Sequence, residues 1–210
     1  MNLQNIPCLS CIRQPKSVFM PYVQSIALVL AAIFIAACGK DIKTNVVKSA
    51  AKNAFAGQNQ FSAQPILISD LQVDGKSEAE YIAKKSPKTI KGWEYDKSSL
   101  NEAFQKSLRE RAAKAGITIV TGGTTLFSIR PIVSWIETGY YRLPAWNAVS
   151  RIKMNVAIVD AKGSVQEEII IEDRIAFDAI MAPDSGGRLR GVARMLGKKF
   201  ADYLKSRTIQ

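Results

Sequence analysis

The clearest alternation of apolar and polar residues lies in the C-terminal half of the chain. Between residues 151 and 158 every second position is apolar: Ile152, Met154, Val156 and Ile158. Residues 165–177 alternate similarly, and the intervening Asp160-Ala161-Lys162-Gly163 predicts a hairpin with Gly163 in the left-handed conformation. An apolar, β-branched run at 66–73 predicts a further strand, and strand-like residues at 117–120 and 126–136, interrupted by Gly122-Gly123, predict another.

Two segments have helical periodicity instead. The first is predicted to begin at Ser99, since Ser99-x-x-Glu102 fits a capping box and Gly116 fits the position after a helix end. Its apolar face comprises Leu100, Phe104 and Leu108. The second has apolar residues at helical spacing: Leu189, Val192, Leu196, Phe200 and Tyr203. Between the first strand and the first helix, residues 76–96 are expected to form a charged connection, in which Ser77-x-x-Glu80 caps a short helix.

This order predicts an α+β fold for residues 65–210. Strand, helix, three strands and helix are most simply arranged as a two-layer sandwich, a mostly antiparallel sheet with two helices on one face. Residues 38–64 are rich in Lys, Asn, Ala, Gln and Ser. They are expected to form a flexible tether with a reach of about 25–30 Å and a transient helix near residues 46–56.

An uncharged apolar run precedes the tether. Residues 25–37 carry no charge, Arg13 and Lys16 lie upstream, and small residues end the run, which is the pattern of a secretory signal at 1–37. A retained membrane helix is the alternative, but the run is shorter than the roughly 20 residues that a span needs. Extending it back to residue 18 would include Pro21 and Gln24. The sequence leaves open whether Met1 or Met20 is the start.

The cysteine that follows this run has a further implication. Ile35-Ala36-Ala37-Cys38 resembles the lipobox of bacterial lipoproteins, in which the thiol is acylated and the chain is cleaved before the cysteine. The resemblance implies a signal peptide at 1–37 and an N-terminus that is anchored to a membrane by lipid, palmitate among its acyl chains. Gly39, in place of an aspartate, favours the periplasmic side of the outer membrane.

Composition limits the chemistry of the mature chain. The leader carries two basic residues and no acidic one, so its removal lowers the net charge from +11 to +9. Export argues against nucleic acid as the partner of this basic chain, and leaves anionic lipid, lipopolysaccharide or acidic protein surfaces. Cys8 and Cys11 would be lost with the leader. The mature domain would then contain no free thiol.

The absence of histidine excludes Ser-His-Asp and Cys-His catalysis. Carboxylates at Glu167, Glu168, Glu172 and Asp173 are candidates for glycosidase-type chemistry, although a solvated strand face explains them better. The glycines and lysines at 191–199 do not have the spacing of a phosphate-binding loop. We therefore expect neither a cofactor nor an enzymatic activity.

Aromatic and basic residues gather in one connection. Residues 135–146 hold two tryptophans, two tyrosines and an arginine, the residue types that dominate protein interfaces. The candidate partner-binding residues are Tyr140, Tyr141, Arg142 and Trp146. The tryptophans have the alternative role of closing one end of the core. A second candidate is the basic helix with Arg188, Arg190, Arg194 and Lys198, for which a solvated face is the alternative.

The lipobox, the tether and the element order resemble small Gram-negative outer-membrane lipoproteins of an uncharacterised family. Gly139, Arg142 and Asp160-Ala161-Lys162-Gly163 resemble motifs of that family, over residues 65–203. The resemblance implies a non-enzymatic outer-membrane lipoprotein that serves as an accessory or scaffold subunit of a cell-envelope assembly. The alternative is an accessory protein that binds or transports lipid or lipopolysaccharide.

Overall fold

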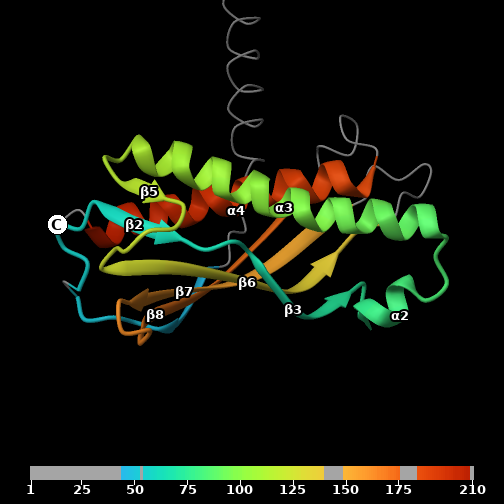
Figure 1. Cartoon of the computed structure of the whole chain (residues 1–210), viewed down its shortest axis with the longest axis horizontal. Helices are drawn as coiled ribbons and strands as arrows, with labels where there is room; N and C mark the ends of the chain where they lie inside the picture. The colour runs from blue at the N-terminus through green and yellow to red at the C-terminus, as the bar shows by residue number, and fades with distance from the viewer. Residues whose placement is uncertain (1–43, 53, 140–148, 176–183, 209–210) are drawn as a thin grey trace, which may run out of the picture. The chain divides into compact units, whose positions relative to one another are not determined.

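A mixed eight-stranded sheet with two long helices on one face forms the folded part of the chain (Figure 1). The computed structural model describes residues 44–52, 54–139, 149–175 and 184–208. The chain divides into two compact units, Met1–Asp41 and Ile42–Gln210, and the described residues all belong to the second. The α+β class predicted from the sequence is confirmed.

Eight strands and three helices are described. The strands are β1 (Thr44–Lys48), β2 (Gln60–Ala63), β3 (Leu67–Val73), β4 (Lys76–Ser77), β5 (Thr118–Val120), β6 (Phe127–Glu137), β7 (Ser150–Asp160) and β8 (Val165–Ile175). The helices are α2 (Glu78–Ile82), α3 (Pro87–Ala113) and α4 (Ser185–Thr208). The sheet order is β1-β8-β7-β6-β2-β5, with β3 also on β6 and β4 on β3.

Half of the sheet is antiparallel, as the alternating sequence predicts. β6, β7, β8 and β1 pair in succession, each antiparallel to the next. Ile152, Met154, Val156 and Ile158 are buried, so the predicted inward face of β7 is confirmed. The predicted hairpin is also confirmed, with Gly163 at a φ of +84°.

The other half contains parallel pairs that the sequence pattern does not reveal. β2 and β3 both pair in parallel with β6, at Ser62–Ser128 and at Leu67–Ile132 respectively. Pro131 lies between these two regions of β6. Because proline has no N–H to donate to a neighbouring strand, the break between β2 and β3 is where β6 tolerates it best.

The first long helix starts earlier than predicted. Ser86 is the N-cap, its side chain accepts a hydrogen bond from the Thr89 N–H, and proline occupies the first turn. Ser99 is a buried residue inside α3 whose hydroxyl donates to the Asp96 carbonyl, so the predicted start at Ser99 is wrong. Residues 76–96 are ordered as β4, α2 and the first turns of α3. The capping box at Ser77 is confirmed.

The predicted tether is also corrected. Residues 44–63 contain two strands of the sheet, and Phe55 between them is fully buried against Phe61 and Phe127. No helix forms near residue 46, since Val46 belongs to β1. The folded unit therefore includes residues from Thr44 onward, about twenty positions before the predicted domain boundary.

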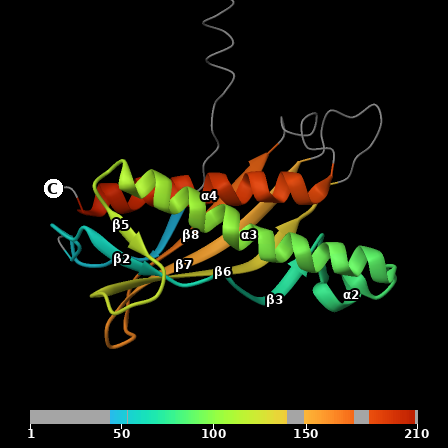
Figure 2. The same cartoon turned by 45° about the horizontal axis from the view of Figure 1, so that its top comes forward.

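The two long helices pack closely against each other and cover the sheet (Figure 2). The predicted apolar faces are confirmed, since Phe104 of α3 and Phe200 of α4 are fully buried. Gly197 allows the close approach: a Cβ there would lie 2.5 Å from the Phe104 carbonyl oxygen and 2.2 Å from the Ser107 hydroxyl. Buried side chains of the two helices and the sheet fill the space between these layers.

Candidate functional site

The face of the sheet opposite the helices carries a row of side chains across four strands. Gln72 of β3 is in register with Trp135 of β6, Trp135 with Lys153 of β7, and Lys153 with Glu172 of β8. Residues in register on neighbouring strands point to the same side of a sheet. The row forms the floor of a hollow with a volume of about 540 Å³, which none of the helices α2, α3 and α4 lines.

Two irregularities in neighbouring strands shape this hollow. The register between β3 and β6 shifts between Ile68 and Gln72, and that between β6 and β7 shifts between Val133 and Trp135. Asp70, at the first shift, has a φ of +48°, and Ser134, at the second, is exposed. Such bulges re-aim side chains. Here they bring Asp70, Ser134 and Trp135 to the border of one hollow.

The lining of the hollow combines an aromatic ring with both signs of charge. Lys153 is exposed and forms no ion pair with a described residue, whereas Arg151 pairs with Glu137 at 3.2 Å between Nε and Oε2. Two acidic residues, Asp70 and Glu172, line the same hollow. An indole ring surrounded by hydrogen-bonding groups of both charges suits contact with a protein surface.

The predicted binding loop lies largely outside the described residues. Tyr140, Tyr141, Arg142 and Trp146 belong to the undescribed residues 140–148, as does Cys38 to residues 1–43. Of the aromatic segment, Trp135 is described. It is half-buried at the hollow, so it lines the candidate site and does not complete the core.

The basic helix does not present four free cations. Arg188 is only 2% exposed and donates hydrogen bonds to the Ser150 hydroxyl and to the Thr138 carbonyl, both at 3.1 Å. Arg190 pairs with Asp96 at 3.4 Å. Arg194 and Lys198 are exposed. Two of the four basic side chains therefore hold the fold together, and the predicted surface is reduced to the other two.

The candidate carboxylates separate onto two faces of β8. Glu168 and Glu172 lie on the open face, and Glu168 accepts a hydrogen bond from the Asn155 amide. Glu167 and Asp173 lie on the helix side, so the solvated strand face that we expected for the four carboxylates is wrong for these two. Asp173 pairs with Lys199 of α4 at 2.6 Å. No two of these acids converge in a pocket, so they do not form a glycosidase-type pair.

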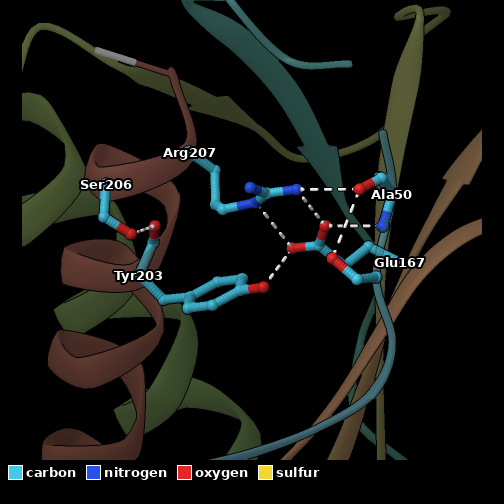
Figure 3. A network of polar contacts seen from close by, with 6 residues as sticks. Ala50, Glu167, Tyr203, Ser206 and Arg207 are labelled. Carbon is cyan, nitrogen blue, oxygen red and sulfur yellow. Dashed lines mark hydrogen bonds and ion pairs between the residues drawn. The ribbon is translucent and has the colours of Figure 1, made fainter. Parts of the chain in front are cut away.

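Glu167 is the centre of a polar network that joins three parts of the chain (Figure 3). Its carboxylate, 1% exposed, accepts hydrogen bonds from Arg207 Nη2 at 2.7 Å, from the Ala50 N–H at 3.0 Å and from the Tyr203 hydroxyl. Arg207 Nη2 also donates to the Ala50 carbonyl at 3.3 Å. Burial, reinforced by the hydrogen bond to Glu167, raises the pKa of the Tyr203 hydroxyl, so this hydroxyl remains a donor. Through these hydrogen bonds Ala50, which follows β1, is held against β8 and α4.

Two further findings concern the metal-ligating residues and the helices of the described part of the chain. No group of three or more His, Cys, Asp or Glu residues within it could hold a metal ion. Among its helices, none is both long enough and apolar enough to cross a membrane.

Comparison with known proteins gives structural matches alone. No family model and no curated protein matches the sequence. A PelC dodecamer from Paraburkholderia phytofirmans is similar with a TM-score of 0.42 and 10% identity, over 80% of this chain and 98% of that one. The DUF330 protein XCC0632 from Xanthomonas campestris gives 0.41 and 9%, over 77% and 92%. A minor lipoprotein from Acinetobacter baumannii gives 0.32 and 10%, over 71% and 90%. Matches at this level carry no argument about function.

Sequence reasoning missed the row on the open face for a physical reason. Gln72, Lys153 and Glu172 are ordinary polar positions of alternating strands, and nothing in the sequence shows that β3 pairs with β6. One signal was present. In residues 127–137 the alternation is interrupted at Ser134-Trp135, where both positions face away from the core and the buried series resumes at Ile136. Such an interruption indicates a bulge and a side chain of special orientation.

Proposed function

We propose that the chain is a non-enzymatic, lipid-anchored accessory subunit of a cell-envelope assembly, which binds a protein partner through the open sheet face around Trp135. The observation that carries this proposal is the cross-strand row with its uncovered hollow. Trp and Arg are the residues most often responsible for binding energy at protein interfaces, and Trp135 and Arg151 both line the hollow. Lys153 lines it too and forms no ion pair with a described residue.

The charge balance of the hollow favours a protein over a lipid headgroup. Asp70 and Glu172 line it together with Arg151 and Lys153, so the lining has no excess positive charge for an anionic membrane. A protein surface can supply groups of both signs. The apolar space between sheet and helices is filled by buried side chains such as Phe104 and Phe200, which leaves little room for an acyl chain there.

The lipobox supports attachment at Cys38, on the periplasmic side of the outer membrane. Because β1 begins at Thr44, the chain between the anchor and the first strand spans at most roughly 20 Å, at 3.3–3.6 Å per residue. The domain would then work close to the membrane surface. The longer reach that we expected from a tether up to residue 64 does not apply.

In-cell photocrosslinking tests the proposal. A photoreactive phenylalanine at Ser134, which is exposed beside the hollow, is expected to capture one reproducible protein, and the same residue at Tyr141 tests the undescribed loop. Lys198 on α4 is the control position, because it is exposed on the other side of the domain. Adducts with lipopolysaccharide or phospholipid and without protein would contradict protein binding and favour the lipid-handling alternative.

A pair of charge reversals makes the test quantitative. Lys153→Glu is expected to reduce co-purification of the captured partner by at least about tenfold, because charge complementarity at an interface is worth a kcal/mol or more. Lys198→Glu makes the same charge change at an exposed helix position and should leave the co-purification of the partner unchanged. Equal losses in both variants would mean that net charge, and not the hollow, governs binding.

A further inference from the structure

A second hollow lies at the opposite end of the sheet. The connection from β5 to β6 and the hairpin between β7 and β8 meet there, since Phe127 at the start of β6 is in register with Asp160 (Figure 1). The hollow has a volume of about 730 Å³, and its lining includes Thr124, Ser128, Arg130 and Lys162. None of these four residues lines the hollow that we propose as the protein-binding surface.

Arg130 is the unusual member of this lining. It is half-buried on the open face of β6, in register with Ala157. Its Nε is enclosed and has no hydrogen-bond partner, and no described residue forms an ion pair with its guanidinium group. By contrast, Arg111, Arg190 and Arg207 each pair with a carboxylate. A partly buried guanidinium group is stabilised by acceptors for its N–H groups and by a counter-charge, so an anion from outside the chain would complete the site.

The acid nearest to this hollow is already engaged. Asp160 borders it, but its Oδ1 accepts hydrogen bonds from the backbone N–H groups of Lys162 and Ser164, both at 2.9 Å. Its Oδ2 accepts from the Gln166 amide at 2.8 Å. These hydrogen bonds satisfy the carboxylate within the hairpin itself. The carboxylate keeps its negative charge and interacts electrostatically with Lys162, so among the described residues Arg130 is the cation left without a counter-charge.

Backbone donors add to the two cations. Gly122 and Gly123 both have positive φ, +75° and +87°, and both line the hollow. Their N–H groups donate to no described residue, and a Cβ at either position would meet nothing within 4 Å. Both glycines therefore leave backbone accessible to a ligand. Hydroxyl groups of Thr124 and Ser128 lie in the same lining.

We propose that this hollow binds a phosphoryl group carried on a larger molecule. A guanidinium group presents paired donors that match phosphate oxygens, a lysine adds a point charge, and N–H and hydroxyl groups can satisfy the remaining oxygens. A tetrahedral oxyanion uses this many donors from several directions better than a planar carboxylate does. The hollow is much larger than one phosphate ion, which leaves space for the rest of the molecule. The proposal does not depend on the protein-binding function or on the lipid anchor.

Nuclear magnetic resonance of the ¹⁵N-labelled chain from residue 39 to 210, which contains the whole second compact unit, tests this site. Inorganic phosphate is titrated at constant ionic strength. The Arg130 Nε–Hε signal and the Gly122 and Gly123 amides are expected to shift together and to saturate at millimolar phosphate. Acetate at the same concentrations should produce less than a tenth of these shifts. Absent or non-saturating shifts, or equal shifts with acetate, would overturn the proposal.

Variants tie the binding to the hollow. Arg130→Gln is expected to abolish the saturable shifts, and Lys162→Gln, on an exposed hairpin position, to weaken binding about five- to tenfold. The control is Arg194→Gln, which removes an equal charge from the exposed side of α4 and should change nothing. If Arg130→Gln fails to fold, the phosphate affinity of Lys162→Gln decides whether the hollow is the binding site. Unchanged affinity in that variant would count against the site.

Two further probes separate the sources of a phosphoryl group. Glycerol phosphate represents a free phosphate ester, and monomeric dihexanoyl phosphatidylglycerol represents a lipid headgroup. Binding of either at the Arg130 signal supports the proposal. A lipid at least tenfold tighter than the ester identifies a headgroup, and similar affinities identify a free ester. The absence of shifts with both would contradict it.

Discussion

Single residues with unexpected burial hold this domain together. A solvated strand face was expected for Glu167, but the residue lies two positions before the inward Ile169 and is 1% exposed. Its partner, Arg207, lies forty residues later in α4, so no local sequence pattern could predict this ion pair. A buried carboxylate is tolerated only with a counter-charge and hydrogen bonds, and the Ala50 backbone and Tyr203 supply the rest.

This pairing makes Arg207 the critical member. Arg207→Met is expected to destabilise residues 39–210 by about 3–5 kcal/mol, because it leaves a buried charge without a partner. The double variant Glu167→Met/Arg207→Met should recover most of that loss. Arg111→Met, which breaks an ion pair whose side chains are about half exposed, should cost less than about 1 kcal/mol. Urea unfolding measures all three. Equal costs for Arg207→Met and Arg111→Met would contradict the buried network.

The elements show which sequence patterns can be trusted. α4, β7 and β8 were predicted because each buries one regular face, and the predicted inward residues of α4, from Leu189 to Phe200, are fully buried. β1 was missed because all five of its residues are exposed, so it has no alternation. The start of α3 was misassigned because Ser99 and Glu102 imitate a capping box. The true signal was Ser86 followed by Pro87, which favours a first helical turn.

The contact between α3 and α4 depends on a glycine that helix propensity alone would disfavour. Gly197→Ala is expected to destabilise the domain by about 1–3 kcal/mol, because the new methyl group would collide with the α3 backbone. Gly92→Ala is the matched control. It lies in the exposed part of α3 with nothing within 4 Å, so it should stabilise the helix by up to about 1 kcal/mol. Thermal unfolding distinguishes the signs, and stabilisation by both changes would contradict the close packing.

At the scale of the whole molecule, the sequence predicted the architecture but not the candidate sites. Both hollows are assembled from segments that are distant in sequence: Gln72 is in register with Trp135 through a parallel pair, and Arg130 of β6 lines one hollow together with Lys162 of the β7–β8 hairpin. The residues that the sequence did single out for binding, Tyr140 to Trp146, remain a prediction, because they lie outside the described residues.

At the scale of the whole molecule, the predicted lipid attachment at Cys38 can be tested most directly. Cys38→Ser is expected to leave a precursor that retains residues 1–37 and takes up no labelled palmitate, because the thiol is the acceptor of the lipid. Gel mobility and metabolic labelling report the two properties separately. Cys11→Ser in the leader is the control and should be processed normally. Normal processing of Cys38→Ser would contradict the anchor, while leaving the site at Arg130 untouched.

The fastening of Ala50 has a mechanical consequence. An edge strand that is pulled away from its neighbour at one end yields one hydrogen-bonded pair at a time, so β1 would peel from β8 under a small force applied at Thr44. Peeling would then reach Ala50, whose N–H and carbonyl are both held by Glu167 and Arg207. From that point a load spreads into β8 and α4 together. A domain tethered at Cys38 would thus release its first strand as a short extensible segment before tension reaches the core from Phe55 onward.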